Sequence, residues 1–188
     1  MLLLEDELQN EIIRMAKYFV IDTNVPVMAG KSVSQLDPSE LECALACLNF
    51  LRSLMSREEN RIAVDLDYYI IKEYKDNLEK REHGNGFSNE FLKWTYACIK
   101  ADESPLTKLN KVGESYLEYP TNELLDKFDP SDKKFIALSN AHPQNPPIVE
   151  GSDCKWWGIV DVLESFGIGV IFPCESYIRS KYEQKLGG

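Results

Sequence analysis

The segment YFVIDTNV, residues 18–25, provides the first evidence for the fold. Its first four residues are apolar and rich in strand-forming side chains, and no polar residue interrupts them. A strand without polar alternation is buried on both faces, as in a parallel sheet. The run ends at Asp22, a carboxylate at the point where the strand leaves the sheet. The stretch therefore predicts a buried parallel strand with an acid at its C-terminal end.

Helices and strands are predicted to alternate along the rest of the chain. After a loop, Asp37 and Pro38 form a cap-and-first-turn signal, and apolar residues recur at helical spacing from Leu41 to Met55. The other predicted elements are, in order, a strand over 61–64, a helix from Asp67 to Leu78, helices over 89–99, 106–116, 121–128 and 131–141, a strand at 148–149, a final helix over 157–166 and a strand over 168–172. This alternation implies one α/β domain, with a parallel sheet and right-handed crossovers.

Charge and hydropathy narrow the classes of function. The chain of 188 residues has a net charge of −10 and a pI of about 4.8. These values argue against a protein that coats nucleic acid through a broad basic face. They do not exclude a nuclease, because cations offset clustered active-site carboxylates. No apolar run reaches the ~18 residues of a membrane span, and the first residues lack a signal-peptide pattern. The expected location is the cytoplasm.

The cysteines do not form a recognisable metal-binding pattern. The chain has five cysteines and two histidines, and no CxxC pair occurs. This argues against a zinc site of the Cys/His type. Cys43 and Cys47 share one face of a predicted helix and are expected to be small buried apolar groups. The cysteines fit a reducing compartment.

Four acids from separate segments are expected to meet at one edge of the sheet. In open parallel sheets, ligands bind beyond the carboxyl ends of the strands. Asp22 follows the first strand, and Asp153 follows the segment IVEGS, so both side chains emerge at that edge. Glu73 lies on the helix after strand 61–64, and Asp132 lies in the first turn of the helix before the third strand. The four carboxylates can therefore share one pocket.

Clustered carboxylates indicate a site for hard divalent cations. Like charges at close range repel one another in a medium of low dielectric constant unless a cation lies between them. Mg²⁺ and similar ions prefer oxygen ligands and keep waters that can be deprotonated to attack phosphorus. The acids therefore favour metal-dependent hydrolysis of a phosphodiester.

The motifs around these acids resemble those of the PIN-domain nuclease family. YFVIDTNV is similar to the family's opening motif, and Glu73 in IIKEY resembles the acid of the second. DPSDKKFIALSNA is similar to the third motif, in which an acid starts a helix. VEGSDCKW resembles the fourth, although Ser152 separates the glycine and the aspartate that the family commonly joins. VLESFGIGVIFPCESYI matches the family's usual close of helix, strand, proline and acid.

The resemblance implies a fold, an activity and a set of site residues. The expected fold is a three-layer α/β/α domain over 1–188, with a helical region over about 83–128 that the small family members lack. The expected activity is that of a hydrolase, a metal-dependent endonuclease acting on RNA, often as the toxin of a toxin–antitoxin pair. Asp22, Glu73, Asp132 and Asp153 would bind Mg²⁺ or Mn²⁺, and Thr23 or Asn24 would support the site by hydrogen bonding. RNA, an antitoxin or other protein, and a second copy in a homodimer are the partners that the resemblance implies.

Several residues keep a second interpretation. Asp129 is either a fifth acid or a helix cap before Pro130. Asp65, Asp67 and Asp76 compete with Glu73 for the second position. Lys133, Lys134 and Lys155 flank two proposed ligands and either hold phosphates or only aid solubility. Trp156 and Trp157 either stack on bases or anchor a helix to the core, which is the favoured interpretation.

Other functions are also compatible with parts of the pattern. The main alternative is a non-catalytic PIN-like scaffold that binds RNA or a protein partner. A haloacid-dehalogenase phosphatase would need a second aspartate where Asn24 stands. A phosphorelay receiver would need an acidic pair earlier in the chain, which KYFVI does not supply.

Overall fold

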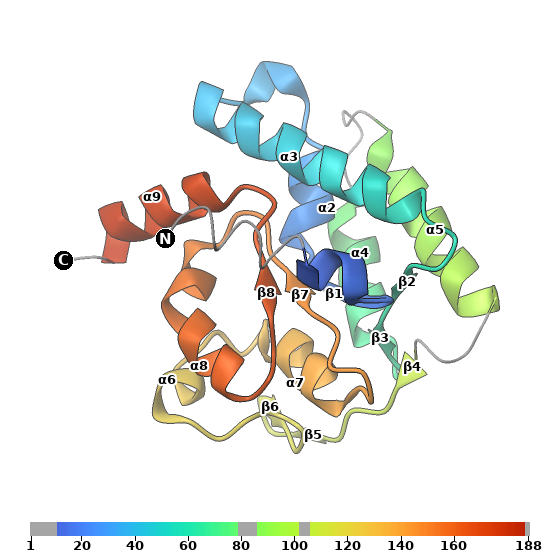
Figure 1. The fold of residues 1–188 in the computed structure, drawn as a ribbon, viewed down its shortest axis with the longest axis vertical. Helices are drawn as coiled ribbons and strands as arrows, with labels where there is room; N and C mark the ends of the chain where they lie inside the picture. The colour runs from blue at the N-terminus through green and yellow to red at the C-terminus, as the bar shows by residue number, and fades with distance from the viewer. Residues whose placement is uncertain (1–10, 79–85, 102–105, 187–188) are drawn as a thin grey trace.

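The computed structural model describes residues 11–78, 86–101 and 106–186, as a mixed α/β fold (Figure 1). Four strands form one parallel sheet in the order β2-β1-β7-β8. They are β1 (Tyr18–Ile21), β2 (Arg61–Ile62), β7 (Ile148–Val149) and β8 (Val170–Ile171). All four residues of β1 are buried, and β1 has a parallel neighbour on each side. The predicted parallel sheet with YFVI as an inner strand is therefore confirmed.

A second pair of strands lies next along the chain. β3 (Val64–Asp65) follows β2 after one residue and pairs in parallel with β4 (Leu106–Thr107). A hairpin comes next, formed by β5 (Lys111–Val112) and β6 (Ser115–Tyr116), and its turn contains Gly113 with a φ of +61°. The prediction of a helix over 106–116 is therefore wrong. Long-range pairing of β4 and the left-handed turn at Gly113, a conformation that glycine adopts at little cost, override the local apolar spacing.

The helices flank the sheet (Figure 1). α4 contacts β3, α5 contacts β2, α7 contacts β1 and β7, and α8 contacts β8. The α-helices are α2 (Asn24–Ala29), α3 (Pro38–Met55), α4 (Tyr69–Leu78), α5 (Phe87–Ala101), α6 (Glu123–Asp126), α7 (Lys133–Ala141), α8 (Val160–Ser165) and α9 (Glu175–Leu186), with 3₁₀ turns η1 (Val33–Gln35) and η2 (Cys154–Ile159).

Local signals set some helix boundaries as expected. The carboxylate of Asp37 accepts hydrogen bonds from Ser39 N and Glu40 N, both at 2.9 Å, and Pro38 is the first residue of α3. The predicted cap of this helix is therefore confirmed. Asp67 does not start α4 as predicted. Asp65 instead accepts hydrogen bonds from Tyr69 N at 2.7 Å and Ile70 N at 2.9 Å.

Other boundaries differ from the predictions. The segment after Asp22 was predicted to be a loop, but α2 begins at once, because Asp22 accepts from Asn24 N at 2.7 Å and its carbonyl from Val25 N at 3.0 Å. The helix predicted over 157–166 is divided into η2 and α8, and it is not the final helix, because α9 follows β8. α6 spans only part of the predicted 121–128, and α7 starts two residues later than predicted.

One continuous apolar core fills the space between sheet and helices. Trp156 is fully buried and meets the Phe128 ring edge-on, with 5.1 Å between centroids. Trp157 is half-buried, with its ring centroid 5.5 Å from that of Phe172. The interpretation of the two tryptophans as core anchors is therefore confirmed. In the described part of the chain, every helix is too short or too polar to cross a membrane.

Candidate active site

Asp22 lies at the C-terminal end of β1 and is almost completely buried, with 1% of its surface exposed. Its backbone N–H donates to Val149 O of β7 at 2.9 Å, which extends the pairing of the two strands. One carboxylate oxygen, Oδ1, accepts from Asn24 N at 2.7 Å. The other oxygen, Oδ2, is buried and has no hydrogen-bond donor among the described residues. The end of the strand therefore holds the carboxylate in place through one oxygen and leaves the other oxygen without a hydrogen bond.

A second buried acid, Glu150, follows β7 in the same way. Ile21 pairs with Val149, so that Asp22 and Glu150 are the next residues on adjacent parallel strands. Glu150 is fully buried, and its Oε1 accepts from Ser152 N and Asp153 N, both at 2.8 Å. Its Oε2 has no donor within the described part of the chain. The sequence prediction missed this residue, although its position after a strand is the same signal that identified Asp22.

The two carboxyl groups interact directly. Burial raises the pKa of Asp22 well above its usual value, and the charges of Glu150 and Asp132 raise this pKa further. Burial also raises the pKa of Glu150, against backbone hydrogen bonds from Asp153 and Ser152 that lower it, and against a side-chain hydrogen bond with Asp22 that forms only when one of the two carboxyl groups is protonated. Two neighbouring buried acids cannot both be ionised without a compensating charge. The pair therefore shares a proton or requires a cation.

Glu73 and Thr23 connect α4 to the end of β1. Thr23 Oγ1 donates to Glu73 Oε1 at 2.6 Å, and Lys134 Nζ lies 2.6 Å from Glu73 Oε2. The side chain of Glu73 is 27% exposed, whereas that of Lys134 is 7% exposed. Lys134 also donates to Ser131 O. An ammonium group buried in α7 thus pairs with this acid.

Asp132 lies between the preceding groups. It is the N-cap residue of α7, but its side chain makes no capping hydrogen bond; its Oδ1 accepts from Ser131 Oγ at 3.3 Å. Burial raises its pKa to about 6; the charge of Lys134 lowers this pKa, and those of Asp129, Asp153 and Glu73 raise it. The charges of Glu73 and Asp153 act on Asp132, and the charge of Asp132 acts on Asp22, so these acids are within electrostatic reach of one another.

Asp153 and the flanking residues lie towards the surface. Asp153 is half-buried, and its Oδ1 accepts from Lys155 N at 3.0 Å at the start of η2. Asp129 Oδ1 accepts from Ser131 N at 3.0 Å, and its Oδ2 lies 3.5 Å from Lys155 Nζ. Lys133 Nζ donates to Asp126 O at 3.1 Å and lies over the Tyr119 ring. The described contacts of Lys133 are thus with α6 and Tyr119.

A cavity of about 300 Å³ opens beside Glu73, and Asp22, Asp132, Glu150 and Asp153 are not among its lining residues. It is lined by Glu73 and Asp76 and by three lysines and two tyrosines: Lys72, Lys111, Lys134, Tyr69 and Tyr116. Asp76, one of the competitors of Glu73, therefore lies on the same cavity, whereas Asp65 is fully buried as the cap of α4.

Among the described residues, the acidic side chains do not form a compact group of metal ligands. In residues 11–78, 86–101 and 106–186, one group of three His, Cys, Asp or Glu side chains has all its ligand atoms within 4.8 Å of one another. That group is Cys43, Cys47 and Cys174, and it contains no carboxylate. Cys43 and Cys174 form a disulfide, so the prediction that the cysteines are separate reduced groups is wrong for this pair. They are 131 residues apart, and tertiary packing brings them together.

No protein-family description matches the chain, and no solved structure matches it significantly.

Proposed function

We propose that this protein is a metal-dependent nuclease with a PIN-like three-layer fold, and that its substrate is RNA. Support for the fold comes from the inner position of β1, its parallel neighbours and the helices that flank the sheet. Support for the activity comes from the acids at the C-terminal edge of that sheet, where ligands of open parallel sheets bind.

The buried pair of Asp22 and Glu150 is the observation that carries the proposal. Each acid has one buried oxygen that no described donor satisfies. An unsatisfied buried polar group costs about 1–3 kcal/mol, and more if it is charged. A bound cation would satisfy both oxygens at once, whereas a proton shared by the two acids leaves one negative charge buried. The unused oxygens are therefore suited to a hard divalent ion.

The proposed ligands are Asp22, Glu150 and Asp132, with Asp153 and Glu73 around them. Oxygen-only donors fit Mg²⁺ or Mn²⁺ and not a thiophilic ion. Such an ion supplies an activated water and stabilises charge on the phosphate oxygens. Thr23 positions Glu73 through its 2.6 Å hydrogen bond, and Lys134 holds the same carboxylate from the other side.

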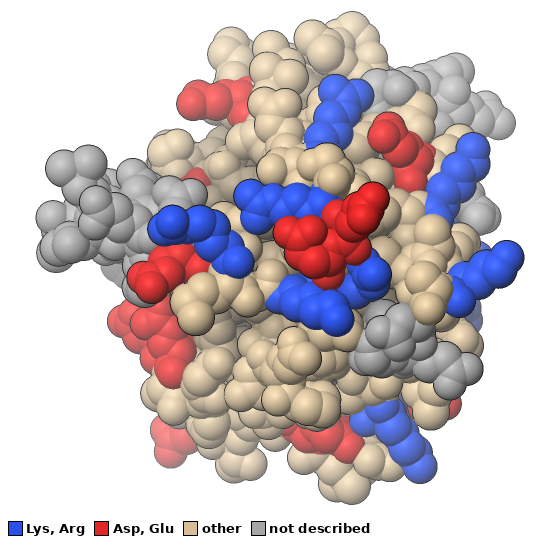
Figure 2. All heavy atoms as spheres, turned by 45° about the vertical axis from the view of Figure 1, so that its right-hand side comes forward, with Lys and Arg blue, Asp and Glu red and all other residues tan. Residues whose placement is uncertain are grey.

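RNA is the substrate favoured by the adjacent cavity. Lys72 and Lys111 provide two ammonium groups on its wall that can hold backbone phosphates, whereas the third lysine, Lys134, pairs with Glu73. Tyr69 and Tyr116 provide aromatic rings that can stack on unpaired bases. Figure 2 shows a face on which Asp and Glu side chains are bordered by Lys and Arg side chains, without one sign covering it. Binding of RNA phosphates by a few lysines at one cavity is compatible with a net charge of −10, whereas binding through a broad basic face is not.

The test is cleavage of labelled single-stranded RNA and DNA in Mn²⁺ or in EDTA. We expect cleavage of RNA that requires metal, and a loss of at least about 100-fold in Asp22→Asn and Glu150→Gln. Asp161→Asn is the matched control, because Asp161 is exposed on α8 and lies outside the proposed site. Full activity in both acid variants, or none in the wild type with either nucleic acid, would refute the proposal.

A non-catalytic scaffold is the second candidate. Two observations favour it: the carboxylates are not gathered into one compact group, and Lys134 already neutralises Glu73. A scaffold would bind RNA equally well in Mn²⁺ and EDTA and leave it intact. The same incubations, analysed by gel shift and by cleavage, separate the two candidates.

A further inference from the structure

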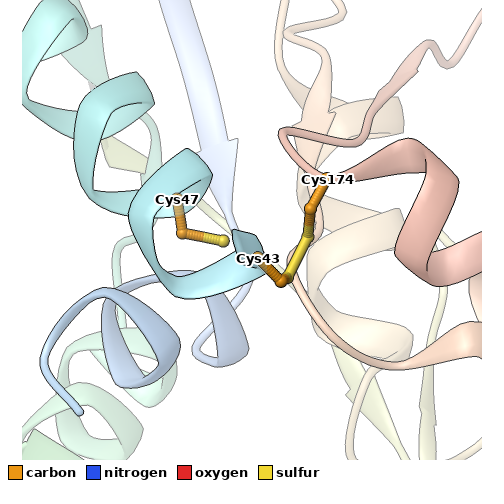
Figure 3. A group of neighbouring side chains, drawn as sticks. All are labelled: Cys43, Cys47 and Cys174. Atoms are coloured by element: carbon orange, nitrogen blue, oxygen red, sulfur yellow. A yellow bond between two sulfur atoms is a disulfide. The ribbon is translucent and has the colours of Figure 1, made fainter. Parts of the chain in front are cut away.

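The described part of the chain contains one compact group of metal-binding side chains, and it consists of sulfur atoms. Cys43 and Cys47 lie one turn apart on α3, and Cys174 lies between β8 and α9. Their Sγ atoms are all within 4.8 Å of one another. Figure 3 shows the Cys47 side chain pointing from α3 towards the paired Cys43 and Cys174. Three cysteine side chains, two from α3 and one from the segment between β8 and α9, thus converge on one point.

We propose that, when Cys43 and Cys174 are reduced, the three cysteines bind Zn²⁺ as thiolates. Zn²⁺ binds thiolate sulfur at about 2.3 Å, which places the sulfurs of a tetrahedral site about 3.8 Å apart. The observed limit of 4.8 Å is close to that spacing. The site requires that the disulfide be broken and that its two sulfur atoms move apart.

The surroundings suit a soft cation. Cys43 and Cys47 are fully buried and Cys174 is 7% exposed, so water competes little for the site. Gly151 O lies 3.0 Å from Cys43 Sγ and 2.8 Å from Cys174 Sγ, so an oxygen donor faces the same point and can be the fourth ligand. Three cysteines with one oxygen give Zn²⁺ its usual four ligands.

An entry path leads to the sulfurs. A cavity of about 510 Å³ is lined by both Cys43 and Cys174, together with residues of α3 and α9 such as Glu42 and Glu183. The acids on its wall attract a divalent cation. Through this cavity an ion and a small thiol reductant can reach the cluster.

The disulfide-bonded state and the zinc-bound state of the three cysteines exclude each other. Two molecules of a reducing thiol such as glutathione together give two electrons and two protons to the Cys43–Cys174 bond and are oxidised to one disulfide of that thiol. Zn²⁺ then displaces three protons, one from each thiol, and forms three metal–sulfur bonds.

This site is separate from the acidic one and does not depend on the proposed function. The thiolate site selects soft ions, whereas Asp22 and Glu150 select hard ones. Gly151 lies between Glu150 and Asp153, so an ion held at its carbonyl also steadies the loop that carries both acids.

The experiment is titration of the full chain with Co²⁺, as a spectroscopic substitute for Zn²⁺, after reduction without added chelating thiols. We expect thiolate-to-cobalt absorption that saturates at about one ion per chain and is displaced by Zn²⁺. The unreduced chain should show no such absorption. Absence of the band in reduced wild type overturns the proposal, whatever the variants do.

Variants assign the ligands. Cys47→Ser and Cys174→Ser should each lose the band, whereas Cys98→Ser should keep it, because Cys98 is a buried cysteine of α5 outside the cluster. Asp22→Asn should also keep it, which separates this site from the acidic one. A band that survives Cys47→Ser, or that disappears in Cys98→Ser, refutes the assignment.

Discussion

At the scale of single residues, Asp22 and Glu150 show how two acids are kept in one buried position. Backbone N–H groups satisfy one oxygen of each, from Asn24 on one side and from Ser152 and Asp153 on the other. The remaining oxygens have no described donor. The two buried oxygens without donors lower the stability of the ligand-free protein at a place where a ligand can bind, which is common at functional sites.

Asp22→Asn is expected to separate activity from stability. The amide can donate to Glu150 Oε2 at any pH, whereas the Asp22 carboxyl group does so only while it is protonated, so the metal-free protein should gain about 1–3 kcal/mol at pH 8. Urea unfolding in EDTA measures this gain, and the cleavage assay measures the loss of activity. A variant that is both inactive and destabilised would show that Asp22 supports the fold and not a ligand.

The stability of the metal-free protein should depend on pH in a definite direction. Burial raises the pKa of Glu150 from 4.5 to about 7, so in this pH window the folded state holds a proton that the unfolded state has lost. The free energy of unfolding in EDTA should therefore fall as the pH rises from 4.5 to about 7. Each unit of pKa shift corresponds to about 1.4 kcal/mol.

Glu150→Gln is the comparison for that measurement. It has no titrating carboxylate at this position, so its urea-unfolding curve should vary less with pH over the same window. An equal slope in wild type and variant would mean that other groups titrate there.

At the scale of elements, α4 places Glu73 at the site, and Asp65 determines where α4 begins. The fully buried carboxylate of Asp65 satisfies the N–H groups of Tyr69 and Ile70. Tyr68, just before the helix, has a φ of +61°, so the chain turns sharply there. The position of Glu73 therefore depends on a cap eight residues earlier.

Asp65→Ala is expected to destabilise the protein by about 1–2 kcal/mol, the usual cost of a lost N-cap. Asp67→Ala is the matched control, because Asp67 is exposed two residues later, and it should change the free energy of unfolding by less than about 0.5 kcal/mol. Chemical denaturation measures both. Equal effects of the two substitutions would contradict the assignment of Asp65 as the cap.

At the scale of the whole molecule, the acids come from four separate parts of the chain, so a bound ion would link them. Asp22 follows β1, Glu73 lies on α4, Asp132 precedes α7 and Glu150 follows β7. A ligand that binds only the folded state stabilises it by mass action.

Mn²⁺ is therefore expected to raise the melting temperature of the wild type. At 100 times the dissociation constant the gain is about 2.7 kcal/mol. Thermal scans with Mn²⁺ and with EDTA measure the shift, which should persist in Asp161→Asn and vanish in Asp22→Asn. An Mn²⁺ shift that survives in Asp22→Asn would place the ion elsewhere.

Local patterns in the sequence determined the buried strand YFVI, its acid at the C-terminal end, and the Asp37–Pro38 start of α3. Each of these depends on residues close together in the chain, where propensity and capping act directly. Tertiary structure alone decided three other features. These are the register that places Glu150 beside Asp22, the contact of Lys134 with Glu73, and the meeting of Cys43 with Cys174. Such contacts depend on how strands and helices pack across more than 60 residues of chain, and local propensity does not encode that packing.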